Sequence, residues 1–212
     1  MPVIPRAPSD PRRGFTIVEL LVVITILALL LALAAFSMSK FFGAGKRAKT
    51  TATIESLKLL AENYRTRFGD YPKDHLSDYG VKSANKTNEG IEAFVVAFFM
   101  KNYDGDRPEE KDLANTDGDR IEGTNPTINP EPALNEVVDA WGNPIVYVQY
   151  SDYDKDQEYE FVAADTEVSA SALVKAEKNP ATGAYHARDS FQILSVGEDG
   201  IYGTDDDITS YR

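Results

Sequence analysis

The sequence contains no cysteine among its 212 residues. Disulfide bridges, cysteine-ligated zinc, iron–sulfur clusters and thiol nucleophiles are therefore excluded. Histidine is scarce: His75 and His186 are the only two, they lie at no metal-ligand spacing, and we expect both to be ordinary surface residues. The G-x-S-x-G, P-loop and G-x-G-x-x-G motifs are missing. No two carboxylates stand out as an acid–base pair, so the sequence does not predict an enzyme.

Basic residues are few in the C-terminal two thirds of the chain. The formal net charge is −12, from 22 basic and 34 acidic residues. Residues 1–14 hold three arginines and one aspartate, a net charge of +2, and residues 15–68 hold seven basic and three acidic residues, a net charge of +4. Residues 69–212 hold 12 basic and 30 acidic residues, a net charge of −18. An acidic body of this kind argues against a nucleic-acid partner.

One long apolar run stands near the N-terminus. Over residues 15–36 the only charged residue is Glu19, and after it only Thr25 is polar. A membrane helix needs about 20 such residues, so the run predicts a single membrane-spanning helix. We expect the helix to continue over residues 37–68 as an amphipathic segment ending at Gly69. Its apolar positions recur at three- and four-residue steps: Ile54, Leu57, Ala61, Tyr64 and Phe68.

The remaining residues, 69–212, read as a small α+β domain. Residues 90–101 form a short apolar helix or strand, which periodicity alone does not decide. Residues 102–136 and 152–190 are mostly loop, and three strands are predicted, over 145–150, 158–163 and 191–196. The predicted fold class is α+β: a long N-terminal helix whose C-terminal half packs on a small antiparallel sheet.

The N-terminal run has two export-signal interpretations. Ala32-Leu33-Ala34 offers a signal-peptidase site, and Arg12-Arg13-Gly14-Phe15 resembles a twin-arginine signal. Neither explains Glu19, although a charge inside an apolar run costs about 2.5 to 3.5 kcal/mol on insertion scales. A carboxylate in that position should therefore have a function.

The stretch GFTIVELLVVITIL at 14–27 resembles the N-terminal signature of type IV pilins and type II secretion pseudopilins. The resemblance implies a pilin-like fold, removal of the leader 1–14 by prepilin peptidase after Gly14, and methylation of the new amino terminus at Phe15. It also implies that Glu19 contacts the Phe15 amine of a neighbouring subunit during assembly. A carboxylate and an ammonium that are both left in lipid favour each other, so such a contact would drive assembly as well as align it. The implied location is the inner membrane, with the leader cytoplasmic and the globular domain periplasmic.

Three further segments resemble the major, G-type pseudopilin of type II secretion. They are the stem exit at 46–72, the DAWGNPIVYV turn and strand at 139–148, in which we expect Trp141 in the core, and SVGEDGIYGTDDDI at 195–208. The resemblance implies a structural subunit that assembles with itself and other pseudopilins into a periplasmic fibre. It would work with the inner-membrane secretion platform to export proteins across the outer membrane. Two alternatives stay open: a type IV pilus subunit for adhesion, motility or DNA uptake, and an exported soluble calcium-binding domain released after Ala34.

The C-terminal loop is the strongest candidate for a metal site. Asp199, Asp205, Asp206 and Asp207 place four carboxylates within nine residues. Carboxylates this close repel one another unless a cation or solvent relieves them, and calcium prefers six to eight oxygen ligands. The resemblance implies that calcium binds here and that the Val196 carbonyl completes the ligand set.

Two other acidic runs begin like an EF-hand loop, at 115–119 and 152–156. The twelfth position is Pro126 in the first and Ala163 in the second, where the EF-hand requires a bidentate glutamate. For each run the sequence leaves open whether it is a solvated loop or a calcium site.

Overall fold

The computed structural model describes residues 15–123 and 133–211, apart from the side chains of residues 34–41. The predicted leader 1–14, including Gly14, lies outside the described residues, as do the last three side chains of the predicted span 15–36. The chain divides into two units, Met1–Phe42 and Gly43–Arg212.

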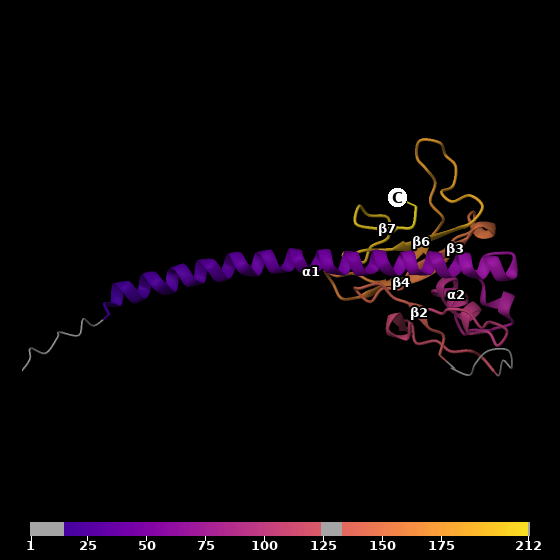
Figure 1. Ribbon diagram of the computed structural model, residues 1–212, viewed down its shortest axis with the longest axis horizontal. Coiled ribbons are helices and arrows are strands. Elements are labelled where there is room, and N and C mark those ends of the chain that lie inside the picture. The colour runs from indigo at the N-terminus through magenta and orange to yellow at the C-terminus, as the bar shows by residue number, and fades with distance from the viewer. Residues whose placement is uncertain (1–14, 124–132, 212) are drawn as a thin grey trace, which may run out of the picture. The chain divides into compact units, whose positions relative to one another are not determined.

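One helix, α1, runs from Ile17 to Phe68 without interruption (Figure 1). It ends as predicted at Gly69, whose φ of 86° is the left-handed conformation that favours glycine after a helix. Within the second unit α1 turns an apolar stripe inward: Ile54, Leu57, Leu60 and Ala61 are all buried. The predicted packing of the C-terminal half of the helix on the domain is confirmed, but of the predicted stripe Tyr64 is only half-buried and Phe68 is 40% exposed.

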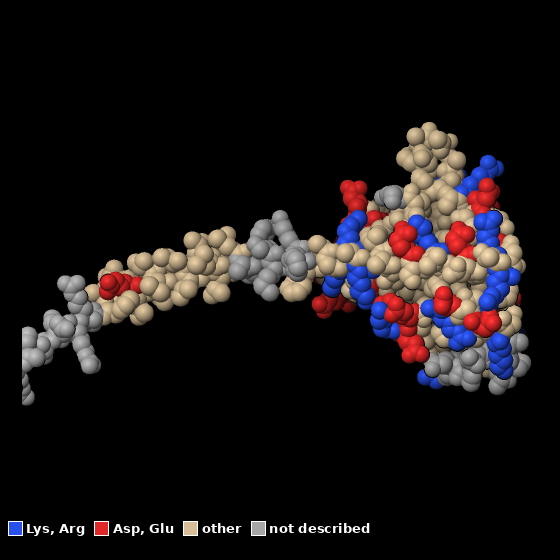
Figure 2. All heavy atoms as spheres, in the orientation of Figure 1, with Lys and Arg blue, Asp and Glu red and all other residues tan. Residues whose placement is uncertain are grey.

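From Ile17 to Leu33 the surface of α1 carries one charged group, the acidic side chain of Glu19, whereas groups of both signs are mixed over the second unit (Figure 2). The described apolar side chains before residue 34 are exposed in the single chain. Among the residues that the structure describes, no helix combines the length and the apolar character needed to cross a membrane.

The described part of the second unit combines one more α-helix and three short 3-10 helices with short antiparallel strands, so the predicted α+β class is confirmed. The elements after α1 are η1 (Leu76–Tyr79), α2 (Glu89–Phe99), η2 (Glu110–Asp112), β1 (Leu113–Ala114), β2 (Glu136–Val137), β3 (Val146–Gln149), η3 (Tyr150–Asp152), β4 (Gln157–Val162), β5 (Ser169–Val174), β6 (Phe191–Ser195) and β7 (Ile208–Thr209). The strands form sheets in the orders β3-β6-β7, β4-β5 and β1-β2.

The three predicted strands are present as β3, β4 and β6, and the undecided segment 90–101 is the helix α2. The sequence did not predict β5, which lies inside the expected loop 152–190 and pairs with β4 along its whole length. Its residues, SASALV, are mostly small, and five of the six are not buried. The alternation of apolar and polar residues that signals a half-buried strand is therefore absent.

The main core lies where α1 and α2 meet the strands, and its aromatic rings are closely packed. Phe94 of α2 and Tyr147 of β3 have ring centroids 4.7 Å apart, and the Tyr147 hydroxyl donates to the Pro72 carbonyl at 2.6 Å. Gly90 allows α2 to approach the strands this closely, because a Cβ there would lie 2.6 Å from the Tyr159 hydroxyl oxygen.

The turn at 139–143 connects the sheets. One carboxylate oxygen of the buried Asp139 accepts from the amides of Trp141, at 2.8 Å, and Asn143, at 3.0 Å, while the other accepts from the Ser195 hydroxyl at 2.7 Å. The Asn143 side chain pairs with the backbone of Val162 in β4. Trp141 is half-buried against the edge of the core and not inside it, because it occupies the turn and not a strand.

Candidate functional site

Glu19 forms a capping box at the start of α1. The Glu19 carboxylate accepts from the backbone amide and the hydroxyl of Thr16, both at 2.9 Å, and the Glu19 amide donates to the Thr16 hydroxyl at 3.2 Å. This reciprocal pair satisfies amides that a helix N-terminus leaves without partners. The T-x-x-E spacing could have indicated it from sequence. Phe15, the predicted new N-terminus, is 77% exposed beside it.

The C-terminal loop organises around Asp206. Its carboxylate accepts from the amides of Glu198, at 2.7 Å, and Asp199, at 3.0 Å, and from the Thr204 hydroxyl at 2.5 Å. Burial alone would raise the pKa of Asp206, but these donors hold the pKa below its ordinary value. Asp206 therefore closes the loop on itself across residues 198–206.

The other predicted ligands of the loop differ in their surroundings. Val196 is fully buried, Asp205 is exposed, and Asp199 accepts from the Ile201 amide at 2.8 Å. Asp207 is 4% exposed, and its Oδ1 has no hydrogen-bond partner among the described residues. Burial raises the pKa of Asp207 to about 6.

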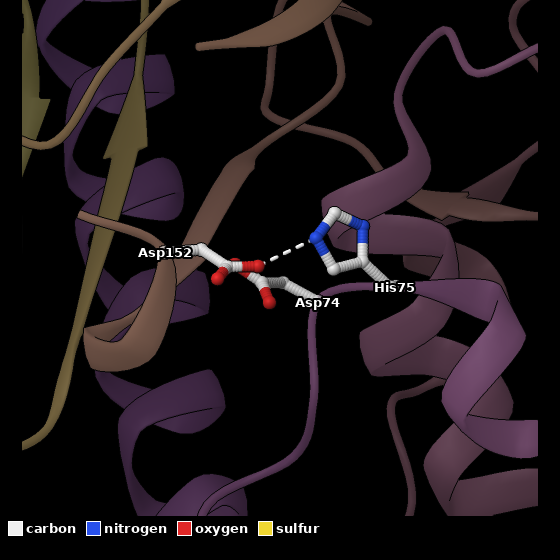
Figure 3. A group of neighbouring side chains, drawn as sticks. All are labelled: Asp74, His75 and Asp152. Carbon is white, nitrogen blue, oxygen red and sulfur yellow. Dashed lines mark ion pairs between the residues drawn. The ribbon is translucent and has the colours of Figure 1, made fainter. Parts of the chain in front are cut away.

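Among the described residues, two groups place three potential ligand atoms within 4.8 Å of one another, and neither contains a C-terminal aspartate. The first joins Asp74, His75 and Asp152 (Figure 3). His75 Nε2 lies 2.5 Å from Asp152, and its Nδ1 lies 3.4 Å from Glu89 of α2. His75 is thus not the ordinary surface residue expected from the sequence, since it links the start of α2 to η3.

Each member of this first group has a partner in the protein. Asp74 accepts from the Gln149 amide and the Gln157 side chain, at 2.9 and 2.8 Å, and Asp152 also pairs with Lys155 at 2.7 Å. Satisfied polar groups of this kind indicate a structural ion-pair cluster. Partial burial alone would lower the pKa of His75, but Asp74, Glu89 and Asp152 hold it above its ordinary value.

This cluster predicts a pH-dependent contribution to stability. Because the folded pKa of His75 is raised, its contribution is fully present below about pH 6.5, the unfolded pKa, and is lost as pH rises through the folded pKa. Replacing His75 by Gln is expected to destabilise the fold more at about pH 5.5 than at about pH 9. Urea denaturation of the Gly43–Arg212 unit, which contains both hydrophobic clusters, measures the difference. An equal cost at both pH values would show that the ion pairs contribute nothing.

The carboxylates of the acidic run 152–156 do not lie together in one cluster. Asp152 joins the His75 cluster, while Asp154 and Asp156 are exposed, and Asp156 lies 3.5 Å from Lys175.

The second group joins Glu92 of α2 with Asp117 and Asp119 of the other undecided run. Glu92 is fully buried and was missed in the sequence analysis. The available signal was the one already applied to Glu19: a lone carboxylate inside an apolar segment, here GIEAFVVAFF.

Comparison with known proteins identifies the N-terminal segment. Residues 10–35 match the family described as Prokaryotic N-terminal methylation motif, and the matched segment includes Gly14, Phe15 and Glu19. The motif supports a type IV pilin-like protein that is processed by prepilin peptidase, has a membrane-anchored N-terminus, and assembles with other pilin-like subunits in a structural, non-enzymatic role. No curated protein and no solved structure matches the chain.

Proposed function

We propose that this type IV pilin-like chain is a structural subunit of a type II secretion pseudopilus. The observation that carries the proposal is the methylation motif over residues 10–35 at the start of a continuous 52-residue α1. The G-type resemblance of the segments 46–72, 139–148 and 195–208 favours secretion over a pilus. After cleavage at Gly14, the chain would be held in the inner membrane with its globular domain in the periplasm.

Assembly would use the exposed apolar surface of the first half of α1. From Ile17 to Leu33 this surface has one charged side chain, Glu19, and helices packed side by side would cover it. Cleavage would create an ammonium at Phe15, four residues before Glu19. A neighbouring subunit's ammonium would then meet the Glu19 carboxylate away from water, where opposite charges attract strongly.

Calcium in the C-terminal loop is part of the proposal, with Val196, Asp199, Asp205, Asp206 and Asp207 as ligands. Support comes from the buried Asp207, whose Oδ1 has no partner among the described residues and so suits a cation. Calcium would cross-link the loop and offset the repulsion among its carboxylates. Asp206, which the loop amides already hold, would keep the loop closed around the ligands.

Deleting the gene in its native host tests the choice of fibre. We expect the export of secreted proteins to the medium to stop, while surface pili remain and a plasmid copy restores export. Normal export accompanied by loss of surface pili would replace the proposal with a type IV pilus subunit.

A further inference from the structure

Three carboxylates from two separate segments of the chain meet, one from α2 and two from the loop that follows β1. One oxygen from each of Glu92, Asp117 and Asp119 lies within 4.8 Å of the other two. Glu92 is 0% exposed and Asp119 is 7% exposed, whereas Asp117 is half-buried and borders solvent. The group therefore has an enclosed end on the helix and an open end on the loop.

The oxygens at the enclosed end accept no hydrogen bond from the other described residues, although the Glu92 and Asp119 carboxyl groups lie against each other. Among the described residues, both carboxylate oxygens of Glu92 and Oδ1 of Asp119 are buried without a hydrogen bond. Burial, with the charges of Asp119 and Glu136, raises the pKa of Glu92 to about 10. A proton shared between Glu92 and Asp119 would satisfy two of these three oxygens, whereas a cation can contact all three.

The surrounding donors hold the other oxygens and do not reach these three. Asn85 donates to Asp117 at 3.0 Å, and the Ser83 hydroxyl donates to Oδ2 of Asp119. The neighbouring Glu136 carboxylate is fully used. It accepts from Asn88 at 3.1 Å and from the amide and hydroxyl of Thr116 at 2.9 and 3.1 Å. These hydrogen bonds thus orient the loop, and they leave both Glu92 oxygens and Oδ1 of Asp119 without a donor from the surrounding described residues.

The donor set selects the kind of ion. All three members of the group offer oxygen, and histidine and cysteine are absent from it, which favours hard cations over zinc or copper. Calcium binds oxygens at about 2.3–2.6 Å, so oxygens on opposite sides of it lie about 4.6–5.2 Å apart. The three ligand oxygens of the group all lie within 4.8 Å of one another, so they are close enough for one ion to contact an oxygen from each. The Asp74–His75–Asp152 cluster has no such free acceptors, because its members already pair within the protein.

We propose that Glu92, Asp117 and Asp119 bind a hard divalent cation, with calcium as the best fit. The ion would connect α2 to the loop before β2 and so fix the position of residues 115–119 on the domain surface. This site is separate from the C-terminal loop, and the proposal of a cation here does not depend on the proposed role in secretion.

Calcium binding to the full-length chain in detergent micelles tests the site. Equilibrium dialysis counts the ions bound by the unmodified chain and by the Glu92→Gln variant, which keeps the shape of the side chain without its charge. We expect Glu92→Gln to bind one calcium fewer per chain. In the presence of chelator, Glu92→Gln should have a higher melting temperature than the unmodified chain. Adding calcium should then raise the melting temperature of Glu92→Gln by less than it raises that of the unmodified chain. Magnesium should bind more weakly at the same site, because it demands a smaller octahedral shell.

Two comparisons make the result specific. Glu89→Gln, the same change on the other acid of α2, should keep the full number of ions. Asp206→Asn reports on calcium binding in the C-terminal loop. Its effect on the number of bound calcium ions should add to the effect of Glu92→Gln, because the two sites are separate. Asp119→Asn serves in place of Glu92→Gln if that variant fails to fold. The site is ruled out if the variants at Glu92 and Asp119 bind as many calcium ions as the unmodified chain.

Discussion

Replacing Glu19 by glutamine is expected to reduce fibre assembly by at least about tenfold, because removing one partner of an ion pair shielded from water leaves the other charge uncompensated. Glutamine serves in capping boxes as glutamate does, so the hydrogen bonds to Thr16 can persist in this variant. Cleavage and membrane retention should be unaffected. Quantifying sheared fibres against total processed protein measures the effect.

The capping box supplies the matched control. Thr16→Val removes the hydroxyl that caps α1 while it keeps the Glu19 charge. We expect this variant to assemble to within about twofold of the unmodified chain, since a single lost cap changes stability only modestly. Equal defects in Thr16→Val and Glu19→Gln would assign the role of Glu19 to helix capping. Normal assembly of Glu19→Gln would rule out the proposed contact between the Glu19 charge and the Phe15 ammonium of a neighbouring subunit.

Replacing Asp139 by alanine should destabilise the Gly43–Arg212 unit by about 3 kcal/mol, since hydrogen bonds to a buried charged group contribute about 1.5–3 kcal/mol each and their loss leaves buried donors unsatisfied. Asp139 is 4% exposed and holds the amides of Trp141 and Asn143 and the hydroxyl of Ser195. The free energy of unfolding in urea measures the cost.

Asp205→Ala is the matched control for this change. Asp205 is exposed, so its loss should change the free energy of unfolding by less than about 0.5 kcal/mol when measured without calcium. A cost for Asp139→Ala as small as that of Asp205→Ala would contradict the anchoring role of the 139–143 turn.

Local patterns were enough to predict much of the fold. The apolar run and the stripe over Ile54, Leu57 and Ala61 predicted α1, and Gly69 predicted its end, because helix periodicity and helix stops are encoded over a few residues. The strands β3, β4 and β6 were predicted for the same reason, since each is a short segment that contains β-branched and aromatic residues.

Long-range contacts could not be predicted in this way. The sequence does not show that Glu92 reaches residues 25 or more positions later, nor that His75 faces Asp152 across 77 positions. Such groups are brought together by the packing of α2 against the strands, which a pattern of neighbouring residues does not specify. For the predicted ligands of the C-terminal loop, proximity in sequence predicted a cluster of carboxylates. In the structure the loop amides hold Asp206, and Asp205 faces solvent.

The mass of the mature chain's N-terminal peptide tests the central claim most directly. Purified from the membrane of cells that contain prepilin peptidase, the chain should begin at Phe15 and carry one added methyl group, as the methylation motif over residues 10–35 indicates. A chain that still begins at Met1, or one that begins at Ala35 after signal-peptide removal, would contradict the account.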